Sequence, residues 1–254
     1  MNTGLILHTL LGLLLLVIPA GLLYWLERPM LRTFGIAVGR AIVQLALLCL
    51  VVWALIRVDS PWLLLLWLVA IAAYSGWLVV KRCKLDVKKM MLSASAGLFI
   101  GVSLVSFWLM ALVFPVRIFD AHWFVPVTAL LMGHATAMMI RGLSTYLSAL
   151  KADEQQYEFL RGNGLAHFKA LLPFLRRSLL AVISPTVANL SVLGLTSMPL
   201  LLVGILLGGL SPLMAFLLTL GMVVGCVSAS VLSLAVTLFL ADRNFTKLNE
   251  TAPS

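Results

Sequence analysis

The sequence predicts an all-α, polytopic membrane protein with about seven transmembrane helices. Hydrophobic residues make up 62% of its 254 residues and charged residues 11%, whereas soluble domains carry roughly 25% charged residues. Apolar runs that approach or exceed the roughly 20 residues needed to cross a bilayer recur along the chain. We therefore expect a single transmembrane domain over residues 1–254, located in a plasma membrane such as the bacterial inner membrane.

Seven apolar runs are long enough to be considered as spans. The first, residues 4–26, has no basic segment before it and no small-residue cleavage site after it, which favours a span over a signal peptide. The sixth is too long for one straight crossing and contains Pro185 and Pro199. This predicts a bend, or a crossing followed by a short re-entrant piece. The predicted spans are residues 4–26, 34–56, 61–80, 90–114, 123–143, 178–207 and 212–241.

Basic residues predict the orientation of these spans. Lysines and arginines cluster in the loops after spans one, three, five and seven, whereas the opposite loops contain Arg57 and Arg117. Cytoplasmic loops of membrane proteins are enriched in Lys and Arg, so we expect the N-terminus outside and the C-terminus in the cytoplasm. The same rule accounts for the net charge of +9. Membrane lipid is therefore an expected partner and nucleic acid is not.

The most elaborate polar segment lies at about residues 146–177, between the fifth and sixth spans. Its acidic residues come first and its basic residues follow, an order that suits the dipole of a helix. Gly162 and Gly164 divide the segment into two pieces. One interpretation is an ordinary solvated helix at the membrane surface. The other is a cytoplasmic coupling segment, centred on residues 151–177, on which a soluble partner docks.

Polar side chains inside the spans are candidates for a substrate path, because ionisable groups in hydrocarbon are costly. Arg40 and Gln44 share one face of span two, although Arg40 is close enough to the cytoplasmic end to snorkel instead. His134 and Met138 share a face of span five, and imidazole and thioether ligands suit a transition metal. The alternative is a histidine that hydrogen bonds a neighbouring helix. A polar strip in span six comprises Asn189, Ser191, Thr196 and Ser197, and either lines the path or bonds other helices.

Several familiar catalytic and energy-coupling motifs do not occur in the sequence. It has no P-loop, no H-E-x-x-H and no G-x-S-x-G, and no Asp or Glu deep in a predicted span. The three cysteines form no CxxC pair, so neither a disulfide framework nor a thiol metal site is expected. A protein that moves a substrate without these elements needs an energy source in a partner.

Four pairs of glycines at i, i+4 lie within spans, at positions 35 and 39, 97 and 101, 204 and 208, and 221 and 225. Small residues at this spacing allow two helices to approach closely. The two helices can belong to one subunit or to two copies of the chain.

Four segments resemble the FetB-type ABC transporter permeases, a family associated with iron export and metal resistance that includes plant relatives linked to aluminium tolerance. They are VGRAIVQL at residues 38–45, the loop at residues 158–164, PTVANLSVLGLTSMP at residues 185–199 and GILLGGLSPLMA at residues 204–215. The chain departs from the family pattern at Leu200, Leu201 and Leu202, where Gly-Met-Met is typical, and at His134, where Asn is typical.

The resemblance implies a permease subunit that catalyses nothing itself and holds no cofactor, resident metal or catalytic residue. It would pair with a second copy and with a separate ABC ATPase that binds ATP and Mg²⁺. The residues implied in ATPase coupling are Glu154, Glu158, Arg161, Gly162, Gly164 and His167. We therefore expect an exporter of iron or another metal.

Two other functions are considered from the residues alone. The first is an intramembrane hydrolase that pairs His134 with a serine of a span, and it requires that serine within hydrogen-bond reach of the imidazole. The available serines are Ser103, Ser106, Ser228 and Ser230. The second is a passive channel or a scaffold.

Overall fold

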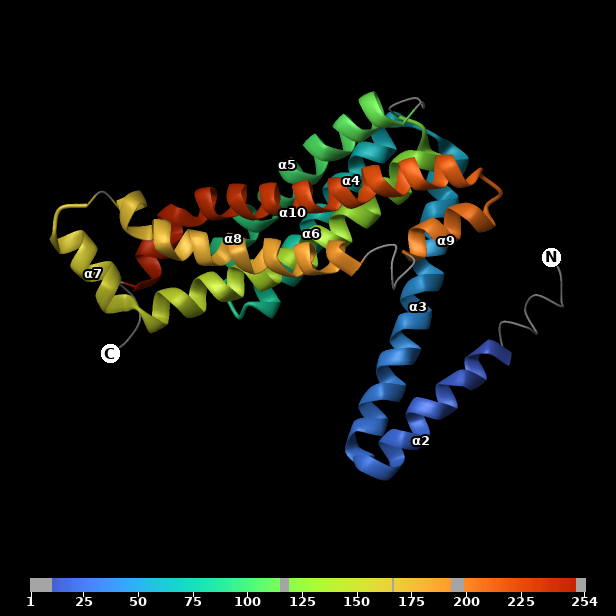
Figure 1. The fold of residues 1–254 in the computed structure, drawn as a ribbon, viewed down its shortest axis with the longest axis horizontal. Coiled ribbons are helices and arrows are strands. Elements are labelled where there is room, and N and C mark those ends of the chain that lie inside the picture. The colour runs from blue at the N-terminus through green and yellow to red at the C-terminus, as the bar shows by residue number, and fades with distance from the viewer. Residues whose placement is uncertain (1–10, 115–118, 166, 193–198, 250–254) are drawn as a thin grey trace. The chain divides into compact units, whose positions relative to one another are not determined.

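The computed structural model describes residues 11–114, 119–165, 167–192 and 199–249, and every regular element within them is a helix (Figure 1). Six helices are long and apolar enough to cross a membrane, and a shorter apolar helix covers Leu11–Leu26. The all-α, polytopic fold is thereby confirmed, and the protein is a multi-pass membrane protein. The chain divides into two compact units, Met1–Arg57 and Val58–Ser254.

The first unit contains a short 3₁₀ turn, η1 (Leu14–Leu16), and the helices α2 (Val17–Leu26) and α3 (Arg28–Val58). A single extended residue, Glu27 with φ −148°, separates α2 from α3 and turns the chain. The predicted span at residues 34–56 lies within α3. Residues 4–10 of the first predicted span lie outside the described residues.

The second unit begins with three long helices, and each starts at a residue that favours the first turn of a helix. Pro61 occupies the first turn of α4 (Pro61–Arg82), where its missing N–H costs nothing. Asp86 caps α5 (Val87–Trp108) by accepting a 3.0 Å hydrogen bond from the Lys88 amide. Asp120 caps α6 (Ala121–Ala152) in the same way, through the His122 amide at 3.0 Å. One turn of π-helix, η2 (Leu109–Val113), ends α5.

The remaining helices of the second unit are α7 (Glu154–Gly162), α8 (His167–Val192), α9 (Leu200–Leu207) and α10 (Pro212–Asn249). The sixth predicted span, residues 178–207, is divided between α8 and α9. The predicted interruption is present, because α8 ends at Val192 and α9 starts after Pro199. The start was also misplaced: α8 begins at His167 and continues through Pro173 and Pro185.

Two glycine pairs bring helices of the second unit into close contact. A Cβ added to Gly97 of α5 would lie 1.9 Å from Thr237 Oγ1 of α10, and one added to Gly101 would lie 2.2 Å from Ser233 Oγ. A Cβ added to Gly225 would lie 2.7 Å from Leu109 Cδ1. These glycines therefore pack helices within one subunit, whereas Gly35, Gly39 and Gly204 have no neighbour of this kind within 4 Å among the described residues.

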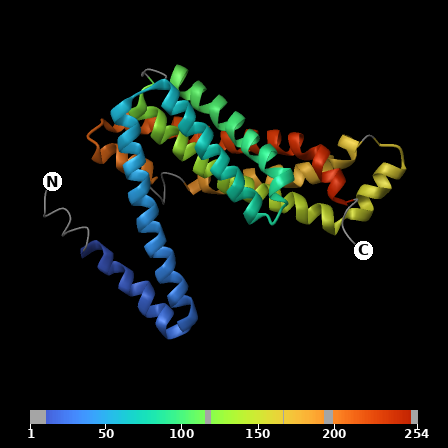
Figure 2. The same ribbon diagram turned by 180° about the vertical axis from the view of Figure 1, so that it is seen from behind.

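The long helices of the second unit form one bundle. Helix α10 packs against α5, α6 and α8, and α4 packs against α5 and α6. Helices α8 and α10 face the viewer in Figure 1, and α4 and α5 do so in Figure 2, which shows the opposite side. In both views α7 lies at one end of this bundle and α9 at the other.

Candidate substrate cavity and coupling elbow

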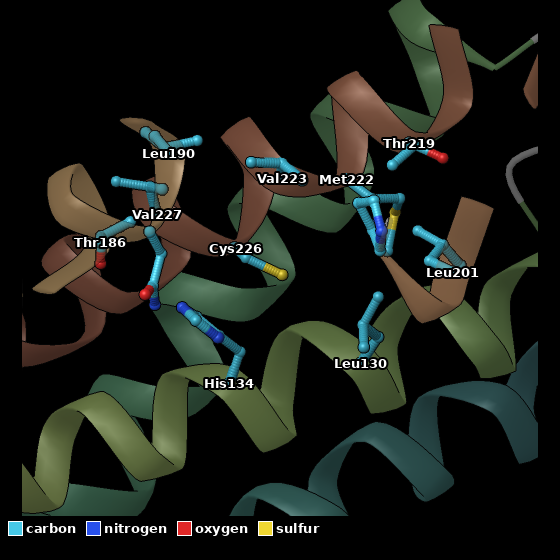
Figure 3. A pocket seen from close by; sticks show the side chains of 12 residues that line it. Leu130, His134, Thr186, Leu190, Leu201, Thr219, Met222, Val223, Cys226 and Val227 are labelled. Atoms are coloured by element: carbon cyan, nitrogen blue, oxygen red, sulfur yellow. The ribbon is translucent and has the colours of Figure 1, made fainter. Parts of the chain in front are cut away.

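A cavity of about 180 Å³ lies between α6, α8, α9 and α10 of the second unit. Most of its lining is apolar, as expected for a site within a helix bundle. Its polar and sulfur-containing side chains are His134, Thr186, Asn189, Thr219, Met222 and Cys226. Figure 3 shows these four helices converging around the cavity.

Two polar atoms at this cavity have no hydrogen-bond partner among the described residues. One is Nε2 of His134, and the other is Oγ1 of Thr219, a residue that is only 5% exposed. The Thr186 hydroxyl, in contrast, donates to the Val182 carbonyl at 3.0 Å. Buried polar atoms in folded proteins nearly always have a partner, and an unpaired one can indicate a missing ligand. The cavity therefore offers an imidazole nitrogen that a ligand could bind.

Sulfur atoms accompany the imidazole. Met222 and Cys226 are four residues apart on α10 and so share a face of that helix. In Figure 3 the His134 side chain comes from α6 and the Cys226 thiol from α10, and both line the cavity. Among the described residues no group of three or more His, Cys, Asp or Glu residues could hold a metal ion. Any metal held here would therefore need the thioether as well.

The structure brings two of the predicted path residues, His134 and Asn189, to this one cavity. Met138 and Ser191 are not in its lining, and the Ser191 hydroxyl donates to the Val187 carbonyl at 3.0 Å. Thr196 and Ser197 lie outside the described residues. Arg40 and Gln44 are exposed on α3 of the first unit, so their place in a path with His134 stays a prediction.

Sequence reasoning missed Thr219, Met222 and Cys226. Their spacing of three and then four residues in the last span places them on one face of a helix, and this pattern is readable in the sequence. The signal was weak because methionine in an apolar span is usually a packing residue. Met132 and Met139 of α6 are indeed buried in the core, at 1% and 0% exposure.

The predicted coupling segment forms an elbow, residues 153–165, between α6 and α8. Helix α7 has Glu154 in its first turn and Arg161 in its last, in the order that the helix dipole favours. The chain leaves α7 through Gly164, whose φ of +81° is a conformation that side-chain-bearing residues rarely adopt. The break predicted at Gly162 and Gly164 therefore falls at Gly164, while Gly162 still belongs to the helix.

Two contacts tie the elbow to α8. The Tyr157 hydroxyl and His167 Nδ1 are 2.8 Å apart and hydrogen bonded. Arg177 forms an ion pair with Asp153, at the start of the elbow. These contacts connect the start and the middle of the elbow to α8.

The outer surface of the elbow combines aromatic and acidic side chains. Phe159 is 69% exposed on α7, and Phe168, at the start of α8, is 51% exposed. Glu154 and Glu158 are exposed on α7 as well. Exposed aromatic residues beside charges are typical of surfaces that bind proteins, so the elbow is suited to docking a soluble partner.

The serine–histidine pair required by a hydrolase is absent from the part of the chain that the structure describes. The hydroxyls of Ser106, Ser228 and Ser230 donate to the backbone carbonyls of Ser103, Val224 and Cys226, respectively. Ser103 Oγ is buried without a partner, and no serine lines the His134 cavity.

Fold and cavity together define a multi-pass α-helical membrane protein with a polar site between its spans. The chain belongs to a family described as Uncharacterised protein family UPF0014, whose model matches residues 6–246. No solved structure matches the chain.

The chain is similar to several known proteins. The Probable iron export permease protein FetB of Escherichia coli (strain K12) is 26% identical over 210 residues, which are 82% of this chain and 80% of that protein. The Protein ALUMINUM SENSITIVE 3 of Arabidopsis thaliana is 26% identical over 216 residues, covering 83% and 77% of the two chains. The UPF0014 membrane protein STAR2 of Oryza sativa subsp. japonica is 27% identical over 210 residues, covering 80% and 70%.

Proposed function

We propose that this protein is the transmembrane permease subunit of an ABC transporter that exports iron or another metal. Two copies would pair in the bacterial inner membrane, and each would dock a separate ATPase subunit on residues 151–177. The ATPase would hold ATP and Mg²⁺, and this chain would catalyse nothing itself. Its N-terminus would lie outside and its C-terminus in the cytoplasm, on the side of the ATPase.

The elbow is the observation that carries this proposal. A chain made almost entirely of spans has one short amphipathic helix at the end of its bundle, with an exposed phenylalanine and two exposed acids. The left-handed Gly164 ends α7 as an ordinary helix cap, and two contacts join the elbow to α8. Both features suit a rigid coupling element, through which closure of the ATPase subunits would move the spans between inward-facing and outward-facing states.

The His134 cavity also supports the proposal, because it places a few polar side chains, among them His134 and Asn189, within the spans. The name of FetB, a probable iron export permease, supports the same class of substrate and the same direction of transport. Export itself rests on that likeness, and the chemistry of the cavity supports a metal ion as the cargo.

The test is ATP-driven metal transport by the chain together with its ATPase in inside-out membrane vesicles. We expect the vesicles to accumulate Fe²⁺ or another first-row metal ion only when ATP and both subunits are present. Accumulation without ATP, or with the chain alone, would contradict the proposal and favour a passive channel.

A pair of phenylalanine variants tests the docking surface. Phe159→Ala should reduce co-purification of the ATPase, because it removes the most exposed aromatic side chain of the elbow. Phe216→Ala is the matched control, since Phe216 is 55% exposed and lies near the start of α10, at the end of the bundle opposite the elbow. Equal loss of the ATPase from both variants would show that the elbow is not the docking surface.

A further inference from the structure

We propose that a groove between α6, α8 and α10 binds an anionic phospholipid, with the lipid phosphate on Arg176 and an acyl chain along the groove. The groove has a volume of about 480 Å³, within the roughly 300–1,000 Å³ of sites for small molecules. It lies at the end of the bundle next to the elbow, because Phe168 at the start of α8 belongs to its lining. The inference goes beyond the proposed function, since it concerns the surrounding membrane and not the cargo.

Most of the groove is lined by hydrocarbon. Leu171 of α8 and Leu238 of α10 are buried and form its floor. Leu172 and Leu180 of α8 and Phe239 of α10 are exposed and form its rims. An open apolar groove on a membrane-spanning bundle is covered by lipid, and its shape suits a flexible hydrocarbon chain.

A single cation stands in this apolar lining, among the residues that the structure describes. Arg176 is exposed, and it makes no hydrogen bond or ion pair with any described residue. Its neighbour Arg177 differs, because it forms an ion pair with Asp153 of the elbow. None of the described lining residues is acidic, so the groove offers Arg176 no counter-ion. The guanidinium is therefore available to an external anion, and its fork of N–H donors matches a phosphate.

Arg176 lies where polar sequence gives way to apolar sequence. The charged elbow precedes it, and the apolar part of α8 begins two residues after it, at Ser178. Lys169 is exposed seven residues earlier, so it lies on the same face of α8 and adds positive charge. Basic pockets between spans at this level bind anionic lipid headgroups. A protein helix packed here would instead cover Arg176 and remove its charge from water, which is strongly unfavourable without an acidic partner.

The experiment measures binding of dioleoylphosphatidylglycerol to the purified full-length chain in a nonionic detergent. Native mass spectrometry counts the lipids that the chain retains as the lipid concentration is raised. We expect Arg176→Gln to weaken the tightest-bound phosphatidylglycerol about 5-fold, the effect of one basic residue on an anionic lipid. Arg176→Lys should keep most of the affinity, because the positive charge remains. Dioleoylphosphatidylcholine, whose headgroup is neutral overall, should bind the wild-type chain and Arg176→Gln equally.

Arg177→Gln is the matched control, because it removes the same charge from the next position of the same helix. Arg177 does not line the groove and is held by Asp153, so this variant should bind phosphatidylglycerol like the wild type. Equal weakening in the two glutamine variants would show a general attraction between a basic protein and anionic lipid, and would overturn the site. Wild-type affinity in Arg176→Gln would overturn it as well.

Soluble glycerol 3-phosphate separates a lipid site from a site for a free phosphate. It carries a phosphate but no acyl chain, so it should not displace phosphatidylglycerol from the wild-type chain even in large excess. Efficient displacement would assign Arg176 to a soluble anion and contradict the lipid proposal. Neither the ATPase nor a transported metal is present in these measurements, so their outcome does not depend on the proposed function.

Discussion

His134 is the residue on which the path hypothesis depends most directly. We predict that His134→Ala reduces ATP-driven transport by roughly 10-fold or more, since in the proposed function this imidazole lines the substrate path. The free energy of unfolding should change by less than about 1 kcal/mol, because the side chain is only partly buried and its Nε2 makes no hydrogen bond among the described residues. Transport assays and thermal unfolding of the same purified variant check both parts. Full transport by this variant would remove His134 from the path.

Glycines of α5 test the packing of the bundle. Gly97→Ala should destabilise the protein by about 1–3 kcal/mol, because its methyl group would lie 1.9 Å from Thr237 Oγ1 and 2.9 Å from the backbone of Ser233. Gly133→Ala on α6 is the control, since nothing lies within 4 Å of its added methyl group. Thermal unfolding in detergent compares the two. Similar melting temperatures would mean that α5 and α10 are less closely packed than described.

At the scale of elements, the turn after α7 gives the sharpest prediction. Gly164→Val forces a β-branched residue into the left-handed region, at a cost of roughly 1–2 kcal/mol, and should therefore alter the path of the elbow. We expect ATP hydrolysis to become uncoupled from transport. The control is Gly162→Ala, two residues earlier and with open space around it. Unchanged coupling in Gly164→Val would mean that the elbow does not transmit motion.

Most elements could be predicted from the sequence because apolar runs and charged loops mark the limits of spans. Residues 61–80 and 90–114 were close to the observed Pro61–Arg82 and Val87–Val113. The fifth predicted span ended at residue 143, whereas α6 continues to Ala152. Hydropathy reports where hydrocarbon ends, whereas a helix continues until its backbone is interrupted. The same limitation hid the start of α8 at His167.

At the scale of the whole molecule, orientation is testable with two matched substitutions. Asp86 and Asp120 both cap a helix through one hydrogen bond, and α5 separates them, so they should face opposite sides of the membrane. In a background that lacks the native cysteines, Asp86→Cys should be protected from an impermeant thiol reagent in intact cells and Asp120→Cys should react. Each loses one cap, about 1 kcal/mol, so differences in folding should largely cancel. The reverse labelling would invert the proposed topology.

The candidate cavity was only partly predictable at this scale. His134 and Asn189 stand out because polar residues are conspicuous in spans, but periodicity cannot determine which helices meet. The contribution of α10, including Cys226, depends on how that helix lies against α6 and α8. Tertiary packing of this kind becomes visible only when the helices are assembled.

The close contact at Gly97 and Gly101 has a mechanical consequence. Helices that meet with no side chain between them cannot slide past one another without steric clash, so α5 and α10 would move as one rigid block in any transport cycle. The compliant part would have to be α8, where Pro173 and Pro185 each remove a backbone hydrogen bond and so make bending easier. The cavity has walls from both α10 and α8. Bending of α8 against a stationary α10 would therefore widen or narrow the cavity, and movement of the elbow would change the size of the cavity.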